Sequence, residues 1–123
     1  MKLKGIRFSY NAAAYFASLD KYPEGLIDEL RKPGQAGFEA LCWTLAEMAK
    51  QAELMRRHMG ETPEEPPTEE DFRIGLRPGQ IGAASKIALE AIVKGMRGGD
   101  DDEDAEIDEV LVELQKQKKT DEA

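Results

Sequence analysis

The chain has 123 residues and a net charge of −8, and the charge is divided unevenly along it. Residues 1–97 hold 14 acidic and 14 basic residues, whereas residues 98–123 hold 11 acids and three lysines. This length suits one domain with a tail. A neutral body with an acidic end argues against nucleic-acid binding, which needs clustered Lys and Arg to displace counterions.

Cysteine usage and hydropathy exclude two further classes. Cys42 is the single cysteine, so no intrachain disulfide is possible. The N-terminal residues lack the apolar run of a signal peptide, and no window approaches the ~20 apolar residues of a membrane span. We therefore expect a soluble, intracellular protein that does not contact a membrane.

The first third of the body predicts a short strand and two helices. Apolar and polar residues alternate over residues 6–10, which is typical of a half-buried strand. Asn11 is a candidate N-cap for a helix that runs to Leu19. After a break at Pro23, residues 24–31 make about two helical turns before a Lys-Pro-Gly stretch ends them.

Residues 36–59 carry the strongest helical pattern in the chain. Apolar residues recur at steps of three and four and form a seam of period 3.5 over three heptads. Gly60 is a natural terminator for this helix. Such a seam can close either a monomer core or a dimer interface, and the pattern alone leaves both open. The seam consists of Phe38, Leu41, Leu45, Met48, Ala52, Met55 and Met59.

A second set of apolar residues on the same helix points the opposite way. At about 100° per residue, Trp43 and Leu54 share nearly one direction, opposite the seam. Either the helix is enclosed on both sides by its own core, or this face binds a partner, since exposed apolar clusters mark interaction sites and Trp is favoured at binding hot spots. The flexible side chains of Met48, Met55 and Met59 suit tolerant contacts with a partner.

The second half of the body predicts a linker and two more helices. Residues 60–67 hold three prolines and three glutamates, which predicts a linker without packed structure. Thr68 and Asp71 then resemble a capping box at the start of a short helix to Leu76. Residues 80–96 are apolar over most of a helical circumference, which predicts a helix in the centre of the core.

Residues 98–123 predict a flexible acidic tail that carries a short amphipathic helix. Two glycines and five consecutive acids precede the apolar stripe of this helix, and lysines follow it. About 14 residues are marginal for an isolated helix, so the stripe is expected to dock, either on a second partner or back on the body. The stripe falls at positions i, i+3, i+4 and i+7 and consists of Ile107, Val110, Leu111 and Leu114.

No set of residues in the sequence predicts catalysis, a metal site or a cofactor. His58 is the only histidine, and Cys42 lies within a helix with no histidine nearby. The glycine-rich stretch 75–86 fails the phosphate-loop pattern because no lysine directly follows its last glycine. The acids at 100–104 lack the ligand spacing of an EF-hand. We therefore expect a non-enzymatic protein.

The order of these elements resembles the tail assembly chaperones of long-tailed bacteriophages and prophages, over about residues 3–97. The resemblance rests on a segment of strand and helix pattern, KLKGIRFSYNAAAYFASL, and on the long helix with FEALCWTLAEMAK. It continues after a proline-rich break with TEEDFRIGL and a closing apolar helix, IGAASKIALEAIVKGM.

The resemblance implies a fold, a function and two partners. It implies a small, mainly α protein that binds the tape measure protein, keeps it soluble and helps to recruit tail tube subunits. Such a protein acts in the host cytoplasm and is absent from the finished virion. Association with itself would follow if the seam of residues 36–59 closes a dimer interface. In many phages a ribosomal frameshift extends these chaperones, and the adjacent lysines 118 and 119 are compatible with one.

Two other functions are compatible with the sequence. A permanent structural adaptor or connector of the virion would be found in purified particles. An acidic DNA mimic would bind a DNA-binding protein in a salt-sensitive way. In fold, the sequence predicts a mainly α body, residues 1–97, with a short N-terminal β-strand and the linker at 60–67, followed by the acidic tail at 98–123.

Overall fold

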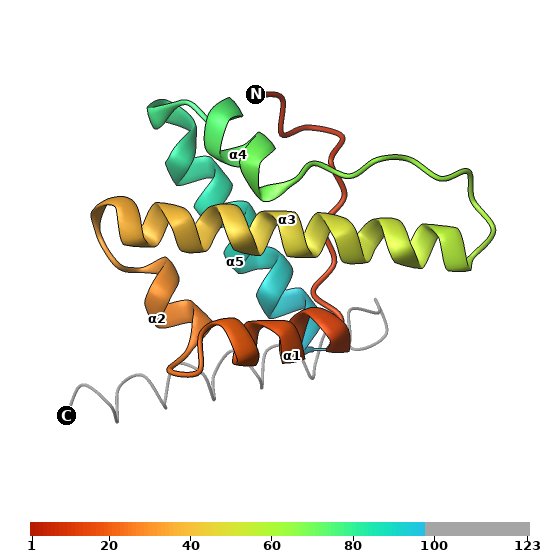
Figure 1. The fold of residues 1–123 in the computed structure, drawn as a ribbon, viewed down its shortest axis with the longest axis horizontal. Helices are drawn as coiled ribbons and strands as arrows, with labels where there is room; N and C mark the ends of the chain where they lie inside the picture. Colours follow the sequence, from red (N-terminus) through yellow and green to blue (C-terminus); the bar gives the residue numbers. More distant parts are fainter. Residues whose placement is uncertain (98–123) are drawn as a thin grey trace.

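This computed structural model describes residues 1–97, which contain five α-helices and one 3-10 turn (Figure 1). The mainly α class is confirmed for these residues. The predicted tail, with Ile107, Val110, Leu111 and Leu114, lies outside the described residues. The elements are α1 (Ala12–Lys21), α2 (Leu26–Leu30), α3 (Gly34–His58), α4 (Glu69–Gly75), η1 (Pro78–Gln80) and α5 (Ile81–Met96).

Helix α3 is the axis of the fold, and each of the other four α-helices packs against it. In Figure 1, α1 and α2 lie along one side of α3, α4 lies along the other side, and α5 crosses it. The core is formed where these helices meet. Its buried residues are Tyr10, Ala14, Leu26, Leu41, Cys42, Leu45, Met48, Phe72, Leu76, Ala84, Ala88 and Ile92.

The apolar seam of α3 is only partly buried in this core. Leu41, Leu45 and Met48 are at most 2% exposed, and Ala52 is also buried. The seam then continues past the neighbouring helices, because 25 residues make α3 about 37 Å long whereas α1 and α5 have 10 and 16 residues. The seam therefore closes the core of a monomer along most of its length and emerges at the C-terminal end of α3.

The segment before α1 differs from its prediction. Residues 6–10 form neither a strand nor a helix, and residues 1–97 contain no strand with which they could pair. Instead, the Ser9 N–H donates to the carbonyl of Met48 on α3 at 3.1 Å. The alternation is still visible in the burial, because Ile6 and Phe8 pack against the core and Tyr10 is buried within it.

Helix α1 begins where its cap was predicted. Asn11 Oδ1 accepts the Ala14 N–H at 3.0 Å, and Asn11 Nδ2 donates to Gln51 Oε1 on α3 at 3.2 Å. The Tyr10 and Ser18 hydroxyls are hydrogen-bonded at 2.8 Å inside the core. One asparagine thus starts α1 and also fixes it to α3.

The capping box of α4 is confirmed. The Asp71 N–H donates to Thr68 Oγ1 at 3.1 Å, and the Thr68 N–H donates to Asp71 Oδ2 at 2.9 Å. Both bonds satisfy amide groups that the first turn of a helix otherwise leaves without partners. The short helix that follows places Phe72 in the core, where its ring lies 6.1 Å from that of Phe8.

Contrary to the prediction from its apolar circumference, helix α5 does not lie in the centre of the core. It buries a single stripe of Ala84, Ala88 and Ile92, while Met96 is 46% exposed. The small residues of this stripe let α5 lie close to its neighbours, but α3 already occupies the centre of the fold. Although α5 is apolar around most of its circumference, only one face is buried, and several other apolar positions are partly covered.

Candidate partner-binding surface

Three exposed apolar side chains lie near the C-terminal end of α3: Met55 and Met59 where the seam leaves the body, and Leu54 on another face of the helix. We call Leu54, Met55 and Met59 the α3 tip; they are 47%, 45% and 77% exposed. Met55 is partly held by the N-terminal segment, since the Ser9 hydroxyl lies 3.1 Å from its sulfur. Large apolar side chains this exposed leave much of their surface in water, which favours covering by another molecule.

The main chain turns back sharply after α3. Gly60 adopts a φ of +85°, which side chains disfavour. The Glu61 N–H donates to the Arg56 carbonyl, and the Gly60 N–H donates to the Arg57 carbonyl, both at 3.0 Å. This pattern is a Schellman motif, and it confirms Gly60 as the terminator that the sequence predicted.

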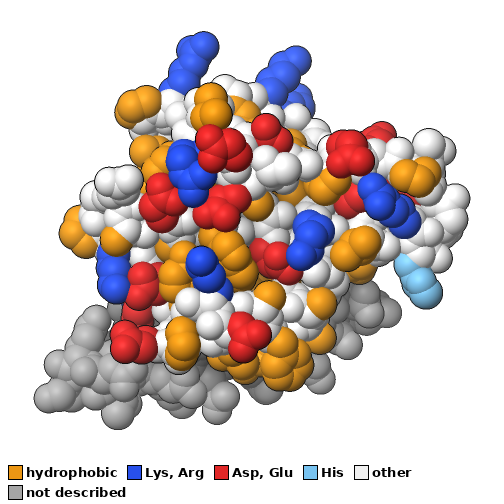
Figure 2. All heavy atoms as spheres, viewed as in Figure 1, with side chains coloured by type: hydrophobic (Ala, Val, Ile, Leu, Met, Phe, Trp, Pro, Cys, Tyr) orange, Lys and Arg blue, Asp and Glu red, His pale blue; other side chains and the backbone are white. Residues whose placement is uncertain are grey.

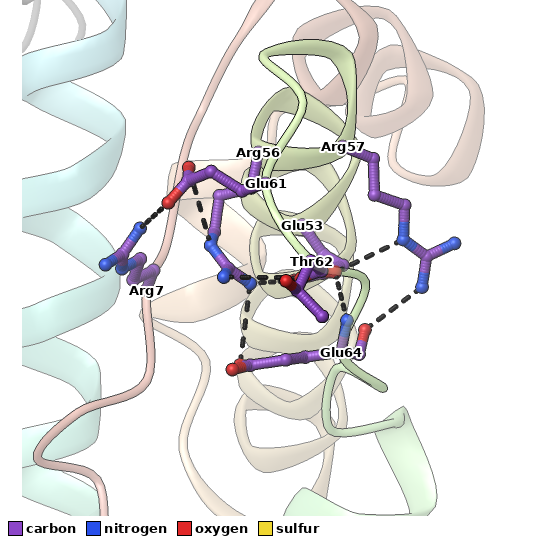
Figure 3. Close-up of polar contacts among 7 residues, drawn as sticks. All are labelled: Arg7, Glu53, Arg56, Arg57, Glu61, Thr62 and Glu64. Atoms are coloured by element: carbon purple, nitrogen blue, oxygen red, sulfur yellow. Dashed lines mark hydrogen bonds and ion pairs between the residues drawn. The ribbon is translucent and has the colours of Figure 1, made fainter.

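A polar cluster holds the returning chain against the flank of α3 (Figure 3). Glu53 accepts from Arg56 Nη1 at 2.7 Å, from Arg57 Nε at 3.2 Å and from the Glu64 N–H at 2.6 Å. Arg57 Nη2 also donates to the Glu64 carbonyl at 3.0 Å. We call Glu53, Arg56, Arg57 and Glu64 the Glu53 clamp. Residues 60–67 are therefore irregular, as predicted, but they are fastened to α3.

The electrostatics of the clamp keep Glu53 ionised. The Glu64 N–H, with help from the two arginines, lowers the pKa of Glu53 below its ordinary value of 4.5, although burial opposes the shift. Arg7 and Arg56 extend the network to Glu61, with ion pairs of 3.8 and 3.7 Å. A carboxylate that is engaged by three donors serves as a fixed acceptor, which suits a structural role better than proton transfer.

A groove of about 430 Å³ runs beside the clamp. It is lined by Ala49 and Ala52 on α3, by residues 5–7 and by residues 64–67. Glu53 and Arg56 also face this groove. An apolar floor between charged walls is suited to contact with a polypeptide.

Trp43 and Leu54, predicted to share one face of α3, differ in their burial. Trp43 is partly buried against the core, and its ring meets that of Tyr22 edge-on at 5.7 Å. Leu54 lies about three helical turns further along α3, beyond these neighbours. Trp43 thus packs within the protein, while Leu54 is at the surface.

Met48 cannot serve as a partner contact in this fold. Its side chain is 0% exposed and lies in the core, so only Met55 and Met59 of the three predicted methionines reach the surface. The sequence pattern missed this difference because all three occupy the same seam.

Two features of the surface were not predicted. The Glu53 clamp had a visible signal, since Glu53, Arg56 and Arg57 have the i, i+3 and i+4 spacing of helical ion pairs. The second feature is the outer face of α1, where the exposed Phe16 and Leu19 are three positions apart, as residues on one side of a helix are. Figure 2 shows hydrophobic side chains at the surface along the lower edge of the body, where Figure 1 places α1.

The structure places Cys42 in the core and His58 at the surface. Burial raises the pKa of the Cys42 thiol to about 11, which keeps it protonated and unreactive. His58 is exposed at the end of α3. Within residues 1–97, no group of three or more His, Cys, Asp or Glu side chains could hold a metal ion, and no helix is long and apolar enough to cross a membrane.

Comparison with known proteins yields no match to a family model, to a curated protein or to a solved structure.

Proposed function

We propose that this chain is a phage tail assembly chaperone that binds the tape measure protein and keeps it soluble until tail tube subunits enclose it. It acts in the host cytoplasm and leaves before the virion is complete. It is not an enzyme and needs no cofactor. The resemblance of residues 3–97 to this family supports the proposal, and the observation that carries it is the exposed α3 tip.

The α3 tip suits a partner with repeated apolar seams. A tape measure protein is expected to be a very long helical chain whose apolar surface lies open before the tube encloses it. Met55 and Met59 can adapt to slightly different seams because methionine is unbranched and flexible. Three side chains bury little area, so each contact is weak, and many copies along one tape give the binding its strength.

The Glu53 clamp supports this surface mechanically. It fastens residues 60–64 to the flank of α3, while Met59 remains 77% exposed. The tip is therefore presented on a helix end whose following loop is held aside. Tail tube subunits that bind the tape more extensively would displace such a cover.

The function is tested by affinity capture of the tagged full chain from phage-producing cells, together with a protein inventory of purified virions. We expect capture of the tape measure protein and the tail tube protein, and no copy of this chain in virions. Finding the chain as a stoichiometric virion component would instead identify a structural adaptor. Capture of a DNA-binding protein alone would identify an acidic DNA mimic.

The role of the tip is tested by the double substitution Leu54→Ser and Met59→Ser. Removing two exposed apolar side chains should weaken tape binding at least about tenfold, since one such side chain is worth about 1.5–3 kcal/mol when fully buried. The melting temperature should stay unchanged. Binding is measured by pull-down titration with a soluble tape fragment.

The matched control is Ile74→Ser on α4, because Ile74 is 75% exposed but lies on a different element. This control should bind the tape as the wild type does. Equal weakening in the control, or unchanged binding in the double variant, would remove the tip from the interface.

A further inference from the structure

Helix α1 carries an apolar stripe in which Tyr15 packs against the edge of the core while Phe16 and Leu19 are exposed. We call Ala12, Tyr15, Phe16 and Leu19 the α1 outer stripe; Phe16 is 64% and Leu19 43% exposed. These positions are i, i+3, i+4 and i+7, so they share one side of the helix. The opposite side holds the buried Ala14 and Ser18. The Tyr15 and Phe16 rings meet edge-on at 5.1 Å, which makes a continuous aromatic surface.

The described chain ends near the residues that precede α1. A Cβ at Gly95 would lie only 2.0 Å from the Tyr10 carbonyl oxygen, so the last turn of α5 touches the residues just before α1. Arg97 is the last described residue. The end of α5 therefore lies close to the N-terminal end of α1.

The sequence that follows has a matching pattern. Its apolar residues at 107, 110, 111 and 114 repeat the i, i+3, i+4, i+7 spacing of the α1 outer stripe. Nine residues, 98–106, precede the first of them and span up to ~30 Å when extended. Helix α1, with 10 residues, is about 15 Å long. The linker therefore reaches every part of the stripe.

The charges favour one direction along α1. The first turn of α1 has no acidic residue, and a helix N-terminus attracts negative charge, which suits the acids at 100–104. At the other end of α1, Asp20 and Glu24 outnumber the single base Lys21, which suits the lysines at 116, 118 and 119. A tail segment that runs parallel to α1 from its N-terminal end would place the acids 100–104 near the helix N-terminus. It would also place the lysines near Asp20 and Glu24.

We propose that the α1 outer stripe is the docking site for the chain's own C-terminal segment, with Ile107, Val110, Leu111 and Leu114 packed against Tyr15, Phe16 and Leu19. The contact is intramolecular and covers the apolar surface of α1 in the free protein. A helical partner with a similar stripe would have to compete with the tail for α1. The inference stands independently of the proposed function, because it concerns only this chain.

The test is hydrogen–deuterium exchange on the full chain, comparing the wild type with the double variant Phe16→Ser and Leu19→Ser. In the wild type, amides in residues 107–114 should exchange at least about tenfold more slowly than in this variant, since undocked residues in so short a helix exchange fast. Ile74→Ser is the control, because it removes an exposed apolar side chain from α4, and should leave this protection intact.

The reciprocal variant, Leu111→Ser with Leu114→Ser, changes no residue of the body. It should speed exchange in α1 and leave exchange in α3 unchanged. Fast exchange of residues 107–114 in the wild type, or protection that survives the Phe16 and Leu19 substitutions, would overturn the proposal. Protection that grows with protein concentration, with dimers in sedimentation, would identify a second copy as the occupant and overturn it too.

Discussion

Gly95 decides how closely α5 approaches the start of α1. The position that a Cβ would occupy lies 2.0 Å from the Tyr10 carbonyl oxygen, 2.7 Å from the Tyr10 Cβ and 2.9 Å from the Tyr10 carbonyl carbon. Two of these three neighbouring atoms are backbone, which cannot rotate away as the end of a flexible side chain can. Gly82 lies on the same helix but has no atom within 4 Å of its Cβ position. Position 95 therefore has no room for a side chain, whereas position 82 on the same helix does.

Gly95→Ala should destabilise the protein by about 1–3 kcal/mol, because the added methyl group forces α5 away from Tyr10. Gly82→Ala is the matched control and should be neutral or stabilising by up to about 1 kcal/mol, since alanine is the better helix former. Urea unfolding followed by circular dichroism measures both. Equal stability of the two variants would show that α5 does not approach Tyr10 this closely.

At the scale of an element, α3 depends on a polar clamp as well as on its apolar seam. Glu53 is 6% exposed and accepts hydrogen bonds from its own helix and from Glu64 eleven residues later. Glu47 on the same helix forms only the more exposed pair with Lys50, at 3.2 Å, and accepts from Gln51. The same residue type thus binds a returning loop at one position and only side chains of its own helix at the other.

Glu53→Gln should loosen residues 60–67, because a neutral amide loses the charge-assisted bonds to Arg56 and Arg57. We expect faster cleavage after the glutamates of this segment by a Glu-specific protease at neutral pH. Glu47→Gln is the control and should be cleaved at the wild-type rate. Equally fast cleavage of both variants would mean that Glu53 does not hold the loop.

The pH dependence of the same variant has a definite sign. The folded pKa of Glu53 lies below its ordinary value of 4.5, so the ionised clamp contributes its full stability above that pH. The contribution is lost as the pH falls below 4.5 through the folded pKa. The difference in melting temperature between wild type and Glu53→Gln should therefore be largest near pH 7 and shrink in acid. A difference independent of pH would refute this linkage.

At the scale of the whole molecule, one helix supplies both the centre of the core and the candidate binding surface. Met48 and Met59 lie in the same seam, eleven residues apart, yet they are 0% and 77% exposed. The difference arises because α1, α2, α4 and α5 surround the first part of α3 and do not extend over its end (Figure 1). The buried part of α3 and its proposed partner-binding part are thus separate along a single helix.

Met48→Ala should lower the free energy of unfolding by about 2–5 kcal/mol, since it leaves a cavity in the core. Met59→Ala should change it by no more than about 0.5 kcal/mol, because it removes an exposed side chain. Chemical denaturation of both variants checks this expectation. Similar losses at the two positions would show that the end of α3 is packed like its centre.

The sequence alone determined the helices and their ends. The cap at Asn11, the box of Thr68 and Asp71, and the terminator Gly60 all appear where they were predicted. Each depends on hydrogen bonds between residues a few positions apart, and the apolar period of α3 is equally local. Of the proposed contact residues in the body, Leu54, Met55 and Met59 are exposed as a binding role requires.

Only the tertiary structure decided which apolar faces are covered. The patterns of Trp43, Met48 and α5 do not state which neighbour lies against each face, and the alternation at 6–10 does not state whether a second strand exists to pair with it. Burial depends on the relative lengths of the helices and on where the loops return. The bond from Glu64 to Glu53 and the exposure of Phe16 on α1 follow from that arrangement, which no local pattern contains.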